Sequence, residues 1–106
     1  MKKSLLAVAH ETAKGLFDAG LMDAKKMRSF DIMCLPSVRK LSPNKIKQIR
    51  IREKVSQHEF AEFLNTRPST IKKWGTGEKH PTGPALRLLN IVEHKGLQAL
   101  LYDEKA

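Results

Sequence analysis

Apolar residues recur at helical spacing along the chain, and no stretch alternates with the period of a β-strand. The pattern predicts one N-terminal helix from residue 4 to about residue 17 and a second that starts at Asp23 and runs through Met33. Another helix is expected at Ser42-Pro43, because serine caps a first turn and proline suits its first position. A last helix opens at Pro84 and is interrupted by Gly96. We therefore predict an all-α fold.

Between these helices, residues 56–77 read as two short helices joined by a tight turn. Ser56 is a good N-cap for the first, and Glu59 completes a capping box. Asn65 breaks the pattern and is one of the few residues other than glycine that tolerates a left-handed backbone. Pro68 suits the first turn of the second helix. The residues expected to end that helix are Gly75 and Gly77.

The two short helices have different faces. The residues expected to point inward are Phe60, Ala61, Leu64, Ile71 and Trp74, and those left outward on the second helix are Ser69, Lys72 and Lys73. A packed helix, a turn and a second helix with a cationic outer face is the helix-turn-helix plan of DNA-binding proteins. The alternative is an ordinary helical hairpin whose lysines only solvate a surface.

The stretch resembles the helix-turn-helix of the Cro/phage-repressor (XRE) family. The matching residues are Ser56, Gln57, Phe60, Ala61, Leu64, Thr70, Ile71, Trp74 and Gly77, and the departures are Asn65, Thr66, Arg67-Pro68 and Gly75. In the family a glutamate at the position of Gly75 typically pairs with an arginine, here Arg50; its absence leaves Arg50 freer to meet a phosphate or weakens the domain slightly. The resemblance implies a phage-repressor-like bundle of about five helices with an N-terminal helical arm.

The same resemblance implies a DNA-binding surface. The residues at base-reading positions are Arg67, Pro68, Ser69, Lys72 and Lys73. Gln57 corresponds to a phosphate or first-base contact, and Thr70 to a phosphate contact. Lys79 and His80 lie where family members reach backbone or minor groove.

The charge balance agrees with an acidic partner. The net charge is +9 and the pI is about 9.9, which favours nucleic acid, an anionic membrane surface or an acidic protein. Residues 39–54 carry one acid, Glu53, against the basic residues Arg39, Lys40, Lys45, Lys47, Arg50, Arg52 and Lys54. A solvated face usually mixes signs, so we interpret this run as a phosphate-contacting surface, with Lys47 and Arg50 as its candidates.

Other chemistries are poorly supported. Cys34 is the only cysteine, so an internal disulfide or a cysteine zinc site is not expected and a reducing compartment fits. The four histidines are scattered, and no metal site, cofactor site or catalytic constellation is recognisable, so we do not expect an enzyme. Leu5–Ala9 is shorter than the apolar core of an export signal, and no run reaches transmembrane length. We expect no membrane partner and a cytoplasmic, nucleoid-associated protein.

Residues 1–37 form the predicted N-terminal arm and linker, and residues 38–106 the helix-turn-helix domain with C-terminal dimerisation helices. The arm carries an apolar stripe of Leu5, Val8, Ala9, Thr12, Ala13, Leu16 and Phe17. Such a stripe is either a satellite of the core or a surface for another protein. The flank from Ala85 to Leu101 is apolar on more than one side and is the candidate homodimer interface.

The order of elements along the whole chain resembles one group within this family. A helical arm, Cys34-Leu35-Pro36, the run from Leu41 to Arg50, the helix-turn-helix and Pro81-x-Gly-Pro-Ala-Leu-Arg-Leu-Leu89 together resemble antitoxins of the HigA type. That resemblance implies a dimer that represses its own operon on double-stranded operator DNA and silences a ribosome-dependent mRNA-cleaving toxin. The residues then expected to bind the toxin are Leu5, Val8, Leu16 and Phe17. The alternative is a stand-alone XRE-type regulator without a toxin partner.

Overall fold

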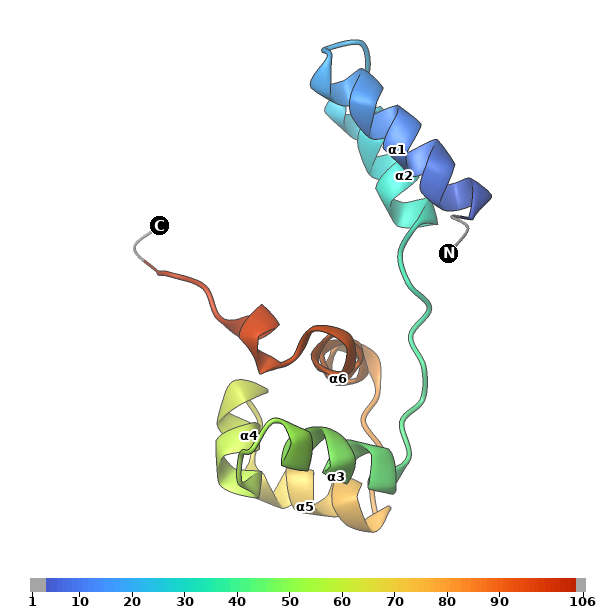
Figure 1. Ribbon diagram of the computed structural model, residues 1–106. Helices are drawn as coiled ribbons and strands as arrows, with labels where there is room; N and C mark the ends of the chain where they lie inside the picture. Colours follow the sequence, from blue (N-terminus) through green and yellow to red (C-terminus); the bar gives the residue numbers. More distant parts are fainter. Residues whose placement is uncertain (1–3, 105–106) are drawn as a thin grey trace. The chain divides into compact units, whose positions relative to one another are not determined.

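The computed structural model describes residues 4–104, which contain six α-helices, one 3-10 helix and no strand (Figure 1). This confirms the all-α prediction. The chain divides into two compact units, Met1–Ser37 and Val38–Ala106. No helix of the described residues is long and apolar enough to cross a membrane. Met1–Lys3, the start of the segment considered as an export signal, lies outside the described residues.

The first unit is a hairpin of two helices, α1 (Leu5–Asp18) and α2 (Ala24–Met33), which pack against each other (Figure 1). The Ser4 hydroxyl accepts the Ala7 N–H at 3.1 Å, and the Asp23 carboxylate accepts the Lys26 N–H at 2.7 Å. Each helix therefore begins at the predicted cap, because these side chains satisfy amides that the first turn leaves without a partner.

The core of this first unit is small. Only Ala13 and Met27 are buried among its described residues. His10 of α1 contacts Asp31 of α2 at 2.6 Å and links the two helices by a polar contact, and Arg28, also on α2, donates to Asp31 at 2.7 Å. These partners lower the pKa of Asp31, the hydrogen bond to His10 having the largest effect.

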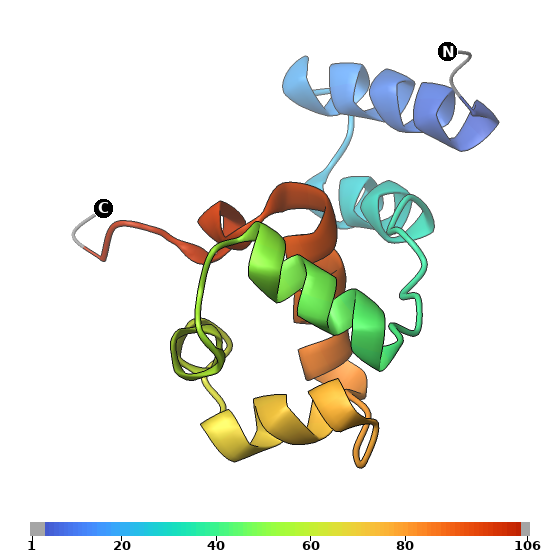
Figure 2. The same cartoon turned by 60° about the horizontal axis from the view of Figure 1, so that its bottom comes forward.

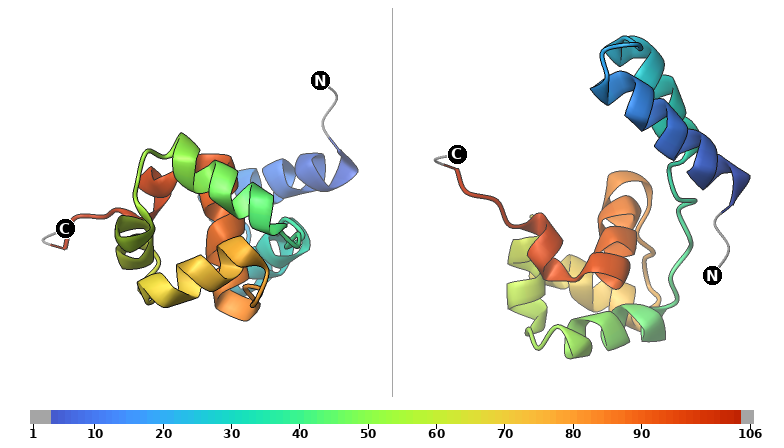
Figure 3. Two further views of the ribbon diagram at one scale, coloured as in Figure 1. Left: turned by 90° about the horizontal axis from the view of Figure 1, so that it is seen from below. Right: turned by 45° about the horizontal axis from the view of Figure 1, so that its top comes forward.

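The second unit packs four α-helices and a short 3-10 helix around one core (Figure 3, left). Its elements are α3 (Pro43–Arg52), α4 (Gln57–Phe63), α5 (Pro68–Thr76), α6 (Gly83–Lys95) and η1 (Leu97–Leu100). The core residues are Leu41, Ile46, Ile49, Phe60, Ala61, Leu64, Ile71, Trp74, Leu89, Val92 and Leu97. Every inward residue predicted for the two short helices is in this core.

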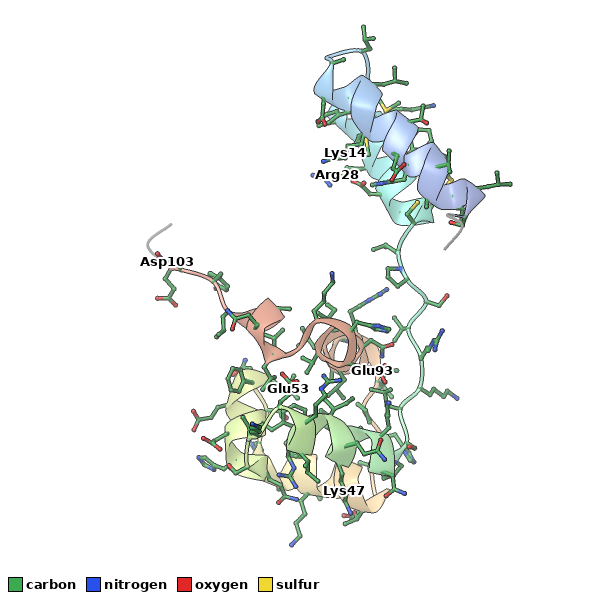
Figure 4. All side chains as sticks on the ribbon, viewed as in Figure 1. Lys14, Arg28, Lys47, Glu53, Glu93 and Asp103 are labelled. Atoms are coloured by element: carbon green, nitrogen blue, oxygen red, sulfur yellow. The ribbon has the colours of Figure 1, made fainter. Side chains whose placement is uncertain are left out.

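The end of α3 holds the end of α6. Arg52 donates from Nη1 and Nη2 to the Glu93 and Val92 carbonyl oxygens at 3.0 and 2.9 Å. Glu53 accepts the Leu97 N–H at 2.7 Å and the Arg52 Nε–H at 3.0 Å. Glu53 and Glu93 are labelled in Figure 4. These contacts satisfy carbonyls at the C-terminus of α6 and fix the start of η1.

The segment before α3 is held by a buried side chain of α6. Asn90 is only 6% exposed, and its Oδ1 accepts the Arg39 N–H at 2.9 Å. Its Nδ2 donates to the Arg39 and Leu86 carbonyl oxygens, both at 2.9 Å. Asn90 lies within residues 85–101, the predicted dimer flank, and its side chain forms hydrogen bonds inside the domain.

Candidate DNA interface

The turn between α4 and α5 is built by its backbone (Figure 2). Asn65 has φ 53°, the predicted left-handed conformation, and its N–H donates to the Glu62 carbonyl at 3.2 Å. The Thr66 N–H donates to the Ala61 carbonyl at 2.9 Å. This pair of bonds is the Schellman motif, which closes α4 and turns the chain into α5.

Caps at both helices confirm the predicted boundaries. Ser56 and Glu59 form the reciprocal capping box, with bonds of 3.0 and 2.9 Å. The Ser56 amide and hydroxyl hydrogen bonds lower the pKa of Glu59 and keep it charged. At the far end, Gly77 caps α5 with φ 81°. The prediction that Gly75 also ends this helix was wrong, because Gly75 is a buried residue within α5.

Buried residues of α5 fix the direction of its outer face. Ile71 and Trp74 are in the core, which leaves the opposite side of the helix to solvent. The predicted base-reading residues Arg67, Pro68, Ser69 and Lys72 are exposed, and Lys73 and Thr70 are half-buried. No acidic residue occurs in α5, so its outer face has a single sign of charge.

The flanking candidates lie on neighbouring elements. Gln57 is the first residue of α4 and is exposed. Lys79 and His80 are exposed in the loop after α5, where the Lys79 N–H donates to the Lys73 carbonyl at 3.3 Å and holds the loop against the helix end.

The basic run of α3 is mostly occupied inside the domain. Lys45 pairs with Glu93 at 3.3 Å, and Arg52 holds the end of α6. Arg50 donates from Nη1 to the Val55 carbonyl at 2.9 Å, so part of its guanidinium group is used inside the domain, and its contact with a phosphate stays a prediction. Sequence reasoning missed these roles because the acceptors are backbone carbonyls and a glutamate far along the chain.

Lys47 differs from the other basic residues of α3, which have partners inside the domain. Its side chain is exposed, and within residues 4–104 no carboxylate or carbonyl holds its ammonium group. Of the two phosphate candidates on α3, Lys47 is therefore the one whose charge is available to a ligand.

Comparison with known proteins identifies the domain. A family model described as helix-turn-helix matches residues 46–90, which include most of α3, all of α4 and α5, and half of α6. These residues form an XRE-type helix-turn-helix domain. The exposed residues of α5 belong to the second helix of this domain, which is the element that helix-turn-helix domains place in the major groove.

A curated relative extends the comparison. The chain is 36% identical over 53 residues to "Antitoxin HigA-2" of Vibrio cholerae serotype O1 (strain ATCC 39315 / El Tor Inaba N16961). The match includes 50% of this chain and 51% of that relative, so the chain spans about half the length of the curated relative it matches. The likeness supports the HigA-type resemblance found in the sequence.

The arm residues predicted to bind a toxin are all on the surface of the first unit. Leu5, Val8, Leu16 and Phe17 are 88%, 46%, 40% and 38% exposed. The predicted stripe, however, is divided between two directions, because Ala13 is buried while these larger side chains are not. The exposed part leaves an apolar surface on α1.

The predicted dimer flank is largely used by the domain itself. Leu89, Val92 and Leu97 are buried in the core, and the half-buried Ala85, Leu86, Leu88 and Leu100 pack against it. Leu101 stays 57% exposed beside a hollow of about 430 Å³ that is also lined by Phe63 and Leu100.

Proposed function

We propose that this XRE-type regulator is a dimeric repressor that also acts as the antitoxin of an mRNA-cleaving toxin and represses the operon encoding both. The observation that carries the proposal is the pairing, in one chain, of a helix-turn-helix unit with its own core and a helical unit with an exposed apolar stripe. The antitoxin name of the curated relative supports this combination.

In the proposed complex, α5 enters the major groove, where base edges carry distinguishable donor and acceptor patterns. Arg67 and Lys72 are exposed cations that can donate to guanine O6 and N7, and Pro68 offers apolar contact to a thymine methyl group. Gln57, Thr70 and Lys47 are assigned to phosphates, which fix the orientation of the protein without reading sequence.

The DNA-binding half is tested with a duplex selected from a random library and an unrelated duplex of equal length. Lys72→Ala is expected to lose roughly 1–3 kcal/mol on the selected duplex and much less on the unrelated one. Lys47→Ala is expected to weaken both alike, since a phosphate contact carries no sequence information. Equal losses for Lys72→Ala on the two duplexes would refute its assignment to base reading.

Toxin binding is assigned to the exposed stripe of α1. Burying a large apolar side chain against a partner contributes about 1.5–3 kcal/mol, so Leu5, Val8, Leu16 and Phe17 together are enough for tight capture even after ordering costs. The stripe lies in the first unit, whereas among residues 4–104 the buried core residues of the DNA-binding unit all fall within residues 41–97. The two functions are therefore expected to be separable by mutation.

The matched variants for this half are Val8→Glu and Ala7→Glu, which add the same carboxylate at adjacent positions of α1. Val8→Glu places it in the apolar stripe, and Ala7→Glu places it about 100° away around the helix. Growth rescue is measured against the product of the adjacent gene. Rescue is expected to fail with Val8→Glu alone, while both variants keep DNA binding. If Val8→Glu and Leu16→Glu both rescue like the parent chain, the stripe does not bind a toxin and the stand-alone regulator is preferred.

A further inference from the structure

Gly75 is a glycine that the backbone does not require. It lies within α5 and is buried, whereas Gly77 caps the helix in a left-handed conformation with φ 81°. Glycine inside a helix costs about 1 kcal/mol relative to alanine. The absence of a side chain at position 75 therefore needs a reason in its surroundings.

The space beside Gly75 is filled by Lys47 of α3. A Cβ atom at position 75 would lie 3.3 Å from Lys47 Cε and 3.9 Å from its Cγ. One turn earlier on α3, Pro43 Cγ lies 3.5 Å from where a Cβ on Gly77 would be. Residues four apart share one face of a helix, so this face of α3 lies against Gly75 of α5 and against Gly77, the C-cap of α5. Figure 4 labels Lys47 in this region, where α3 and α5 meet.

The position of Gly75 on α5 determines where the Lys47 side chain crosses that helix. Gly75, Lys72 and Pro68 are separated by three and four residues and therefore lie along one flank of the helix. Lys72 and Pro68 are exposed on the proposed reading face, so the Lys47 stem crosses α5 at the border of that face. Lysine side chains commonly bury the stem on apolar surface and keep the ammonium group in water.

We propose that Gly75 is a positioning residue: it seats the Lys47 stem across α5 so that the ammonium group stands beside the reading face and binds a DNA phosphate. The inference rests on the proposed DNA-binding function and adds how Gly75 positions Lys47 for its phosphate contact. Lys47 is the α3 cation that the domain does not use internally, which is why its placement matters.

The test is a double-mutant cycle in the full chain, with Lys47→Met, Gly75→Leu and both together. Methionine keeps a stem without charge, and leucine occupies the space of the stem. Affinity is measured from 50 to 200 mM salt for a library-selected duplex and an unrelated duplex. Lys47→Met is expected to reduce the salt slope by about 0.9, so that the parent chain loses about 3.5-fold more affinity over this range. Gly75→Leu is expected to do the same, and the double variant to be no weaker than either single one.

Two results overturn the inference: Gly75→Leu with the salt slope of the parent chain, or a double variant in which the two losses add. The matched control is Gly15→Leu on α1, where a new side chain meets nothing within 4 Å and the slope should not change. If Gly75→Leu does not fold by Trp74 fluorescence, Gly75→Ala serves, since its Cβ still crowds Lys47; an unchanged slope again refutes the inference. A parent chain that binds neither duplex refutes the proposed function itself, whereas failure of the cycle alone leaves that function standing.

Discussion

Asn90 offers the sharpest test of how the second unit is held together. In Asn90→Ala the Arg39 N–H and carbonyl lose their side-chain partners, both at 2.9 Å. The bond to Leu86 is a smaller loss, because that carbonyl is also within reach of the α6 backbone ladder. At about 1 kcal/mol for each net hydrogen bond, the expected loss is about 2 kcal/mol of unfolding free energy.

The assay follows thermal unfolding by the fluorescence of Trp74, the only tryptophan, which is buried in this unit and reports on it alone. A loss of 1 kcal/mol lowers the Tm of a domain of this size by about 4–8 °C, so Asn90→Ala is expected to lower it by about 8–16 °C. Asn44→Ala is the control, because Asn44 is exposed at the start of α3. Equal Tm values for the two variants would refute the reasoning.

Asn90→Asp separates the hydrogen bonds from simple packing. The carboxylate still accepts the Arg39 N–H, but its second oxygen faces the Arg39 and Leu86 carbonyls, where the amide donated. A buried charge without a donor there raises the pKa of the new aspartate. Because the raised pKa belongs to the folded state, the variant is expected to recover stability as pH falls through that pKa. A variant that only loses stability on acidification would contradict this.

Three further outcomes are expected. Lys54 follows Glu53, the C-cap of α3, and has φ 59°, so Lys54→Gly should raise the unfolding free energy by about 0.5–1 kcal/mol in urea titrations, and a loss would show that its left-handed backbone is not strained. The Leu97 N–H and then Arg52 lower the pKa of Glu53 from 4.5, so its stabilisation is present above that pH and is lost as pH falls through the folded value; Glu53→Gln should flatten the acid limb of stability, and Glu62→Gln should not. The proposed homodimer should sediment as such at micromolar concentration and protect two half-sites about one DNA turn apart, and a monomer protecting a single half-site would exclude it.

Local signals in the sequence predicted most of the helix boundaries. Ser4, Asp23, Ser42 and Ser56 all cap the helices they were expected to cap, because a cap depends on residues three positions apart. The left-handed conformation of Asn65 was predicted because asparagine tolerates that backbone better than most residues. Lys54 was not, since lysine gives no sign of a left-handed backbone and the conformation there is fixed by bonds to α3.

The outer face of α5 could be predicted from the sequence, but the roles of the neighbouring residues on α3 and of Gly75 could not. Ile71 and Trp74 orient α5 through helical spacing alone. The hydrogen-bond partners of Arg50 and Arg52 are backbone carbonyls that tertiary packing brings near. Because every residue has a carbonyl, the sequence does not indicate which of them accept these bonds. Gly75 was misread as a helix end because its partner, Lys47, lies on another helix.

Some basic residues are bound inside the domain and others are exposed, and this difference changes what the net charge of +9 implies for DNA binding. Of the four basic residues of α3, Lys45, Arg50 and Arg52 bind a glutamate or backbone carbonyls of the same domain, so they are poor candidates for displacing counterions from DNA. Each phosphate neutralised contributes about 0.9 to the salt slope. The slope should therefore follow the exposed cations of α5, its loop and Lys47, and fall well short of the count of lysines and arginines. Positive charge in the sequence sets an upper limit on phosphate contacts, and the fold decides how much of it reaches the DNA.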